Sequence, residues 1–311
     1  MRPQGGILGA TVTPTTTAAS GVWTLREAER FRQGNTWPKP FEPSDLSGLQ
    51  LWLDASYANS LYDATSGGSL VEADGSVARW EDRSGNGRHA TQSTTGSRPL
   101  RKASMQGGRD VLRFDGSDDF LSIPSSTSAF NFLHDGTSTL FIVYKWTSPG
   151  SSPDRRQLLS NCTNSDSVDG TTGSLVWLRN DFGTSSPYSK AQFVVANNGA
   201  TRSNSYTGDN SFPAGTFQVL TVESDPANST NADRVIFRNN GTVKDDTAAG
   251  DGASVPTGNA TYDLHLCTQG GPDGRYYAQA DLCEVILYDS TLSDTNRAAV
   301  EDYLKAKWSI S

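Results

Sequence analysis

The sequence predicts an all-β protein in which two antiparallel sheets pack as a jelly-roll sandwich. Short apolar runs recur from residue 48 onward, and polar linkers rich in Ser, Thr, Asn, Asp and Gly separate them. This is the pattern of short strands joined by turns. No long helical period lies between these runs, which argues against parallel βαβ units. We therefore expect two packed antiparallel sheets.

Residues 1–45 differ from the rest of the chain and predict an arm. The segment 11–17 is nearly all Thr with one Pro, a composition that favours an extended chain. The Pro-rich segment 37–43 predicts a stiff linker. We therefore divide the chain into an N-terminal anchoring arm with its linker, residues 1–45, and one sandwich domain, residues 46–311.

A short helix is expected inside the arm. Thr24 can cap this helix, with Glu27 at the third helical position completing a capping box. Leu25, Ala28 and Phe31 recur at helical spacing and share one face. The Gly-Asn pair at 34–35 then ends the helix.

The apolar residues of the arm need a surface to cover them, because a helix this short is marginal in water on its own. Two alternatives follow. The arm folds back on its own sandwich, or it docks on another protein through Trp23, Leu25, Phe31 and Trp37.

The sandwich domain is expected to open with the alternating run 49–54. Further strands are expected at 111–115, 139–146, 174–179, 191–196, 217–223, 234–238, 262–267 and 281–288. A helix closes the domain, with Ser293 as its N-cap and an apolar stripe that ends at Trp308.

Two corners of the domain have the same types of residue at their turns. In the segments 80–90 and 111–121 an apolar strand runs into a turn of Asp, Ser, Asn and Gly. These residue types tolerate positive φ or bond their own backbone, so each segment predicts a tight corner between strands.

Together the two corners resemble the signature of concanavalin A-like, laminin-G-type β-sandwich domains of bacterial and phage proteins. The segments 49–54 and 282–308 resemble the same family, and the landmarks together span nearly all of 48–311. The resemblance implies one domain whose role is binding more often than catalysis. The arm, from Gly21-Val22-Trp23 to Trp37-Pro38, is similar to an N-terminal element of marine phage virion proteins.

The first corner copies half of a calcium-binding loop. Asp82, Ser84 and Asn86 place oxygens at alternate positions, and Gly87 follows for the bend. The twelfth position of such a loop is Ser93 here instead of a bidentate Glu.

The second corner supplies Asp115, Asp118 and Asp119, which would add ligands if the two corners meet. The resemblance implies calcium near a ligand rim. The alternative is that both corners are plain turns, so calcium is one of two interpretations and no other cofactor is expected.

Glycan binding requires an aromatic ring against the apolar side of a sugar, with amides and carboxylates at its hydroxyls. The tyrosines that lie in polar, Gly-rich surroundings are Tyr57, Tyr62, Tyr188, Tyr206, Tyr276 and Tyr277. The alternative for each of them is packing beneath its own loop.

Charge and composition argue against several classes of function. The chain has 34 acidic and 26 basic residues and no Lys/Arg block, so nucleic-acid binding is not expected. No apolar run is long enough to span a bilayer. Residues 1–20 lack the apolar core of a secretory signal.

The scattered cysteines Cys162, Cys267 and Cys283 predict no disulfide framework, and the latter two are expected to be buried thiols.

No catalytic set is visible. The Glu-x-Asp-x-x-Glu strand of β-sandwich glucanases is approached at Glu72-Ala73-Asp74 and at Glu223-Ser224-Asp225, but Val77 and Asn228 stand in place of the last Glu. The histidines are far apart and have no metal-ligand spacing. We therefore do not expect an enzyme.

The leading hypothesis is a phage virion structural protein, associated with a tail or fibre or decorating the capsid. Residues 1–45 would bind other virion proteins, and the sandwich would face a host-surface glycan in many copies, so that weak sites gain avidity. A purely structural cement or spacer is the alternative, and a glycan-active enzyme is a weaker one.

Overall fold

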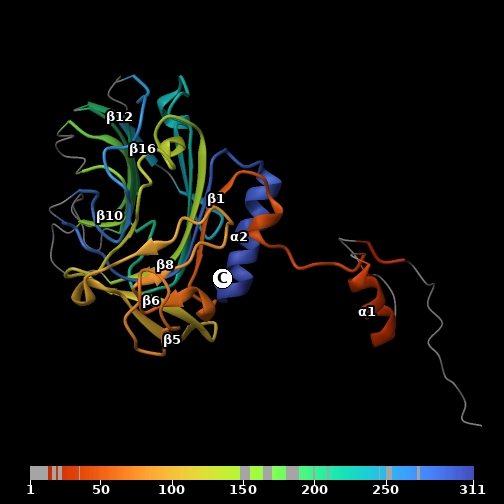
Figure 1. Cartoon of the computed structure of the whole chain (residues 1–311). Helices are drawn as coiled ribbons and strands as arrows, with labels where there is room; N and C mark the ends of the chain where they lie inside the picture. Colours follow the sequence, from red (N-terminus) through yellow and green to blue (C-terminus); the bar gives the residue numbers. More distant parts are fainter. Residues whose placement is uncertain are drawn as a thin grey trace, which may run out of the picture. The chain divides into compact units, whose positions relative to one another are not determined.

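The computed structural model describes residues 13–15, 19, 23–34, 36–147, 155–163, 170–179, 189–198, 200–208, 210–244, 246–249, 254–271 and 274–311. The chain divides into two compact units, Met1–Glu42 and Pro43–Ser311. Within the larger unit two antiparallel sheets lie face to face (Figure 1). The predicted antiparallel sandwich with one short N-terminal and one C-terminal helix is confirmed.

Sheet A has the strand order β15-β14-β13-β8-β18-β6-β5, and β1 pairs with the second half of β18. Its strands are β1 Leu49–Asp54, β5 Leu100–Gln106, β6 Arg109–Asp115, β8 Ser138–Trp146, β13 Gln218–Ser224, β14 Val235–Asn239, β15 Thr242–Lys244 and β18 Gln279–Tyr288.

Sheet B has the order β16-β12-β11-β10-β9-β17-β7-β4-β3-β2. Its strands are β2 Leu61–Tyr62, β3 Arg79–Trp80, β4 Ala90–Thr91, β7 Leu121–Ile123, β9 Arg155–Ser160, β10 Thr172–Arg179, β11 Lys190–Asn197, β12 Ala200–Thr207, β16 Asp246–Ala249 and β17 Leu264–Leu266. Short 3-10 helices are η1 Pro43–Asp45, η2 Ala58–Ser60, η3 Thr95–Ser97, η4 Asn131–Leu133 and η5 Asn231–Asp233.

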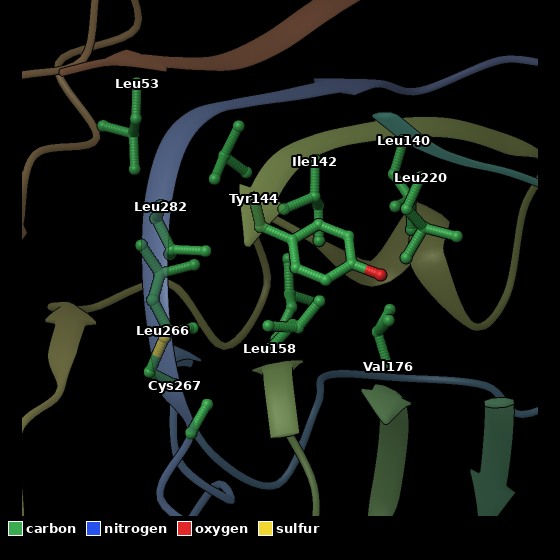
Figure 2. Packing of buried hydrophobic residues seen from close by; sticks show 14 of the residues in the cluster. Leu53, Leu140, Ile142, Tyr144, Leu158, Val176, Leu220, Leu266, Cys267 and Leu282 are labelled. Carbon is green, nitrogen blue, oxygen red and sulfur yellow. The ribbon is translucent and has the colours of Figure 1, made fainter. Parts of the chain in front are cut away.

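The main core lies between the two sheets. Alternate residues of each central strand point inward, and Figure 2 shows Ile142 and Leu220 of sheet A facing Leu158 and Val176 of sheet B. Cys267 belongs to this core. All three cysteines are free and buried, as predicted for Cys267 and Cys283.

Helix α2, Asp294–Trp308, covers the outer face of sheet A beside β1 (Figure 1). The predicted N-cap is confirmed, because the Ser293 side chain accepts a hydrogen bond from the N–H of Asn296. Glu284 of β18 is fully buried beneath the helix and accepts from the indole N–H groups of Trp52 and Trp308, both at 2.7 Å. A buried carboxylate is tolerated here because donors surround it.

The predicted strands all occur, within a few residues of their expected ends. Several further strands were missed, and they are either very short or polar. β12, with the sequence Ala-Thr-Arg-Ser-Asn-Ser-Tyr-Thr, alternates strictly between buried and more exposed positions. Its buried set consists of Ser and Thr, so no apolar period marked the strand.

The smaller unit holds helix α1, Leu25–Gln33. The predicted capping box is confirmed: Glu27 N–H donates to Thr24 Oγ1 at 3.2 Å, and Thr24 N–H donates to Glu27 Oε2 at 2.9 Å. The helix ends at Gly34, whose N–H donates to the carbonyl of Arg30.

An aromatic cluster stabilises this unit. Trp23 packs edge-to-face on Phe31 and Trp37, with ring centroids 5.3 and 5.9 Å apart. Leu25 does not join the cluster, because it is 91% exposed. In the described part of the chain, no helix is both long enough and apolar enough to cross a membrane.

Candidate functional site

The first Asp turn, residues 82–88, follows β3. Asp82 is buried, and both of its oxygens are occupied. Oδ1 accepts from the N–H groups of Trp52 (3.0 Å) and Ser84 (2.9 Å), and Oδ2 accepts from Arg88 N–H (3.0 Å) and Ser84 Oγ (2.8 Å). This carboxylate therefore ties the turn to β1.

The other predicted calcium ligands of this turn are also used by the fold. Ser84 Oγ accepts from Asn86 N–H at 3.2 Å. The Asn86 amide nitrogen donates to the carbonyls of Leu49 and Gln50, at 3.0 and 3.1 Å. The turn closes on itself and on β1 instead of presenting oxygens to a cation.

The second Asp turn, residues 115–119, connects β6 to β7 and has a different geometry. Asp115, Asp118 and Asp119 each offer an oxygen, and these oxygens lie within 4.8 Å of one another. Asp82 is not part of this cluster. The structure therefore brings together only the second half of the predicted calcium set.

Each carboxylate of the second Asp turn uses one oxygen to hold the loop. Asp115 Oδ1 accepts from Ser117 N–H (2.8 Å), Asp118 Oδ2 accepts from Ser97 Oγ (3.0 Å), and Asp119 Oδ2 accepts from Asp115 N–H (3.0 Å). In the described part of the chain, the second oxygen of each has no hydrogen-bond partner. No Lys or Arg in that part pairs with any of the three.

The electrostatics of this turn favour a cation. Asp119 is only 6% exposed. The pKa of its carboxyl is raised to about 6: burial is the main cause, the hydrogen bond from Asp115 N–H acts against it, and the neighbouring charges of Asp115 and Asp118 add to the rise. Three hard oxygens of this kind are the ligands that calcium takes, with carbonyls or water completing the shell. The residues present therefore fit the ion that the family resemblance implies.

The turn is held rigidly against its neighbours. Gly116 has φ +79°, and a Cβ there would lie 2.7 Å from the Cβ of Gln279, so only glycine fits. Arg156 Nη1 donates to the carbonyl of Tyr277 at 2.8 Å and to that of Gly116 at 3.5 Å. One side chain thus links the acidic turn to the predicted ligand tyrosine.

Aromatic rings lie beside the acidic oxygens. The ring of Phe120 is 6.4 Å from that of Tyr277 and 5.8 Å from that of His265, and all three residues are partly exposed. Burial raises the pKa of Tyr277, and the charge of Asp118 raises it further, which places the phenol within the field of the cluster. Sequence reasoning missed Phe120 and His265, although Phe120 directly follows the acidic run.

Two of the other predicted tyrosines pack against arginines. Tyr57 is 48% exposed, and the Arg83 guanidinium lies 4.6 Å from its ring centre and 4.0 Å from that of Trp52. The Arg79 guanidinium lies 4.1 Å from the ring centre of Tyr62. These contacts are cation–π packing within the fold.

Two further tyrosines lie on sheet B and its border. The Tyr276 ring is 5.0 Å from that of Trp177 on β10, and Lys190 Nζ is 5.5 Å from the ring of Tyr206 on β12. Tyr188 lies outside the described residues. The described tyrosines of this set therefore do not form one cluster, and among them only Tyr277 lies beside the acidic turn.

No protein-family model and no curated protein matches the sequence. Among solved structures, the binding domain of Paraclostridial Mosquitocidal Protein 1 has a TM-score of 0.52 at 12% identity, covering 85% of this chain and 53% of that one. This likeness supports the sandwich fold.

Two other similar structures are a sialidase module and the binding domain of a neurotoxin. The Ruminococcus gnavus IT-sialidase module CBM40, bound to α2,3-sialyllactose, has a TM-score of 0.43 at 13% identity, with 65% of this chain and 97% of that one covered. The botulinum neurotoxin serotype D binding domain has a TM-score of 0.48 at 10% identity, with 83% and 51% covered. The chain thus spans about half the length of the two toxin domains.

Proposed function

We propose that the Pro43–Ser311 unit is a lectin-like module that binds a glycan at the second Asp turn. The observation that carries the proposal is the meeting of three carboxylates with the rings of Phe120 and Tyr277 on one partly exposed corner. A ring stacks on the apolar face of a sugar while oxygens and bound cations hold its hydroxyls.

In this proposal Asp115, Asp118 and Asp119 hold a calcium ion, which supplies a hard Lewis acid for sugar hydroxyls. The chain's own residues do the positioning. Gly116 lets the turn approach Gln279, and Arg156 fixes the backbone at both Gly116 and Tyr277. A site built on bonded backbone keeps its geometry before the ligand arrives, which reduces the entropy lost on binding.

A glycan array that includes α2,3-sialyllactose and neutral oligosaccharides tests this function, read with calcium and with EGTA. We expect binding that EGTA abolishes and that Asp118→Asn weakens about tenfold, the loss of one charge-assisted contact. Asp135→Asn is the matched control, because Asp135 is also exposed and lies outside the acidic cluster. A wild-type chain that binds no glycan would reject the lectin role and favour the cement alternative.

We further propose that the arm attaches the protein to a phage virion, as a tail, fibre or capsid-decorating component present in many copies. The capping box and the Trp23–Phe31–Trp37 cluster support this, because they preorganise a short helix that leaves Leu25 exposed. Deleting residues 1–42 and measuring incorporation into particles tests the attachment. Leu25→Asp should reduce incorporation, whereas Arg32→Asp on the same helix serves as the control, and normal assembly of the deletion variant would overturn the proposal.

A further inference from the structure

The outer face of sheet B carries a polar row close to the second Asp turn. Thr91 of β4, Ser122 of β7 and His265 of β17 lie opposite one another on neighbouring strands. The chain neighbours of Ser122 and His265 on either side belong to the core between the sheets, and side chains alternate along a strand. The three residues therefore face outward, and each is partly exposed. We call Thr91, Ser122 and His265 the outer row.

The outer row continues the surface of the proposed glycan site. Phe120 lies on the same face as Ser122, and its ring is 5.8 Å from that of His265 and 6.4 Å from that of Tyr277. Neighbouring strands are about 4.8 Å apart, so the step from His265 to Thr91 spans about 10 Å. A ligand that reaches from the acidic turn along this row therefore needs more than one sugar ring.

His265 presents a hydrogen-bond acceptor to solvent. Its Nδ1 lies 2.7 Å from the carbonyl oxygen of Asp263. Because a carbonyl only accepts, Nδ1 carries the proton and Nε2 is left as an acceptor. Burial lowers the pKa of His265, against the hydrogen bond and the charge of Asp263, so the ring is neutral at pH 7. Nε2 has no hydrogen-bond partner among the described residues and is not enclosed.

Two hydroxyls extend this pattern along the row. Ser122 Oγ also reaches solvent and has no hydrogen-bond partner among the described residues. Thr91 Oγ1 donates to the Ser122 carbonyl at 3.3 Å, which leaves its lone pairs to accept. The row thus offers two acceptors and, between them, a hydroxyl that both donates and accepts. This set is uncharged and matches the hydroxyl groups of a neutral sugar.

We propose that the outer row is the subsite for a second, uncharged sugar unit, which rests against Phe120 and donates a hydroxyl hydrogen to His265 Nε2. The ligand is then an oligosaccharide, with one unit at the acidic turn and the next on the row. This inference rests on the proposed function and deepens it, because it gives the ligand's minimum length and the chemistry of its second unit.

Sugars of increasing length test the second subsite. Titration calorimetry in a calcium buffer would compare glucose, galactose, mannose and N-acetylglucosamine with their linear oligomers of two to four units. We expect the best oligomer to bind at least about tenfold more tightly than its own monosaccharide, since the second unit adds hydrogen bonds and a ring contact.

Two substitutions remove the polar groups of the row. His265→Phe keeps a ring beside Phe120 and removes the accepting nitrogen, and Ser122→Ala removes the hydroxyl. Each should weaken oligomer binding about three- to tenfold and leave monosaccharide binding unchanged. Ser229→Ala is the matched control, because Ser229 is also exposed but lies between β13 and β14 of sheet A; it should change neither affinity.

Melting temperatures show whether the variants are folded. Ser122→Ala should melt with the wild type, because its hydroxyl bonds no described residue, and it decides the question if His265→Phe does not fold. Asp118→Asn should weaken monosaccharides and oligomers alike, because it changes the first unit's site.

The outcomes separate the two claims. If oligomers bind no more tightly than monosaccharides, or if the folded row variants bind oligomers as tightly as wild type, the second subsite is refuted while the proposed function stands. If a row variant weakens monosaccharides by the same factor as oligomers, the row belongs to the first unit and the inference is overturned. If the wild-type protein binds no sugar of any length, both claims are rejected.

Discussion

In the first Asp turn, Ser84 N–H donates to Asp82 Oδ1 at 2.9 Å; in the second, Ser117 N–H donates to Asp115 Oδ1 at 2.8 Å. Both turns thus begin with an Asp side chain that bonds the backbone two residues on. They differ in the second carboxylate oxygen. Asp82 Oδ2 accepts two further hydrogen bonds, whereas Asp115 Oδ2 accepts none in the described part of the chain.

The surroundings of the two turns explain why their carboxylate oxygens are bonded differently. The first turn lies against β1, where Trp52 N–H needs an acceptor and Asp82 supplies it. The second turn gathers three acids, and no Lys or Arg among the described residues pairs with them. The same local motif therefore bonds both carboxylate oxygens in one place, and in the other it leaves one oxygen of each Asp without a hydrogen-bond partner among the described residues.

The largest expected effect that tests this comparison comes from Asp82→Ala. The substitution leaves the N–H groups of Trp52, Ser84 and Arg88 without their acceptor. We expect a loss of about 3 kcal/mol in the free energy of unfolding, measured by urea titration. Asp118→Ala should change it by less than about 0.5 kcal/mol. Equal losses in the two variants would show that the turns do not differ in role.

Calcium provides the next test. If the second turn binds calcium, the ion stabilises the folded state by about 2.7 kcal/mol at a concentration one hundred times its dissociation constant. The rise in melting temperature should disappear in Asp115→Asn. It should persist in Ser84→Ala, which alters only the first turn. An equal rise in wild type and Asp115→Asn would place the ion elsewhere.

The pKa of Asp119 predicts a pH dependence. Because burial raises this pKa to about 6 in the folded chain, protonation favours the folded state. That contribution is fully present below the unfolded value of about 4 and is lost as the pH rises through about 6. Without calcium, wild type should therefore lose stability relative to Asp119→Asn between those values.

The reverse holds for calcium affinity, since the ion needs the ionised carboxylate. Affinity for calcium in wild type should fall as the pH drops below about 6, which titration calorimetry at several pH values would show. A flat stability difference between wild type and Asp119→Asn across this range would contradict the raised pKa.

The sequence predicts the central strands well because their apolar residues are nearly continuous, as in Leu140 to Val143 of β8. It does not reveal β12, whose inward positions are Ser and Thr. Both acidic turns are visible from their Asp, Ser and Gly content. The sequence does not show in which turn the carboxylate oxygens lack hydrogen-bond partners among the described residues. That depends on contacts with β1, which form only on folding.

The aromatic residues of the candidate site show a second limit of prediction from sequence. Tyr277 lies beside Asp118 because Asp115 is in register with Gln279 across β6 and β18, a pairing over a long sequence separation. Local patterns carry no information on such register.

The smallest expected effect compares the serines that occupy matching positions in the two turns. Ser84 Oγ donates to Asp82 Oδ2 and accepts from Asn86 N–H, so Ser84→Ala should cost about 1 kcal/mol. Ser117 Oγ makes no hydrogen bond to any described residue, so Ser117→Ala should lie within about 0.5 kcal/mol of wild type. Urea titrations of both variants, with and without calcium, measure the difference. If Ser117→Ala is as destabilising as Ser84→Ala, the hydroxyl in the second turn has a partner, and that turn is a closed structural corner like the first.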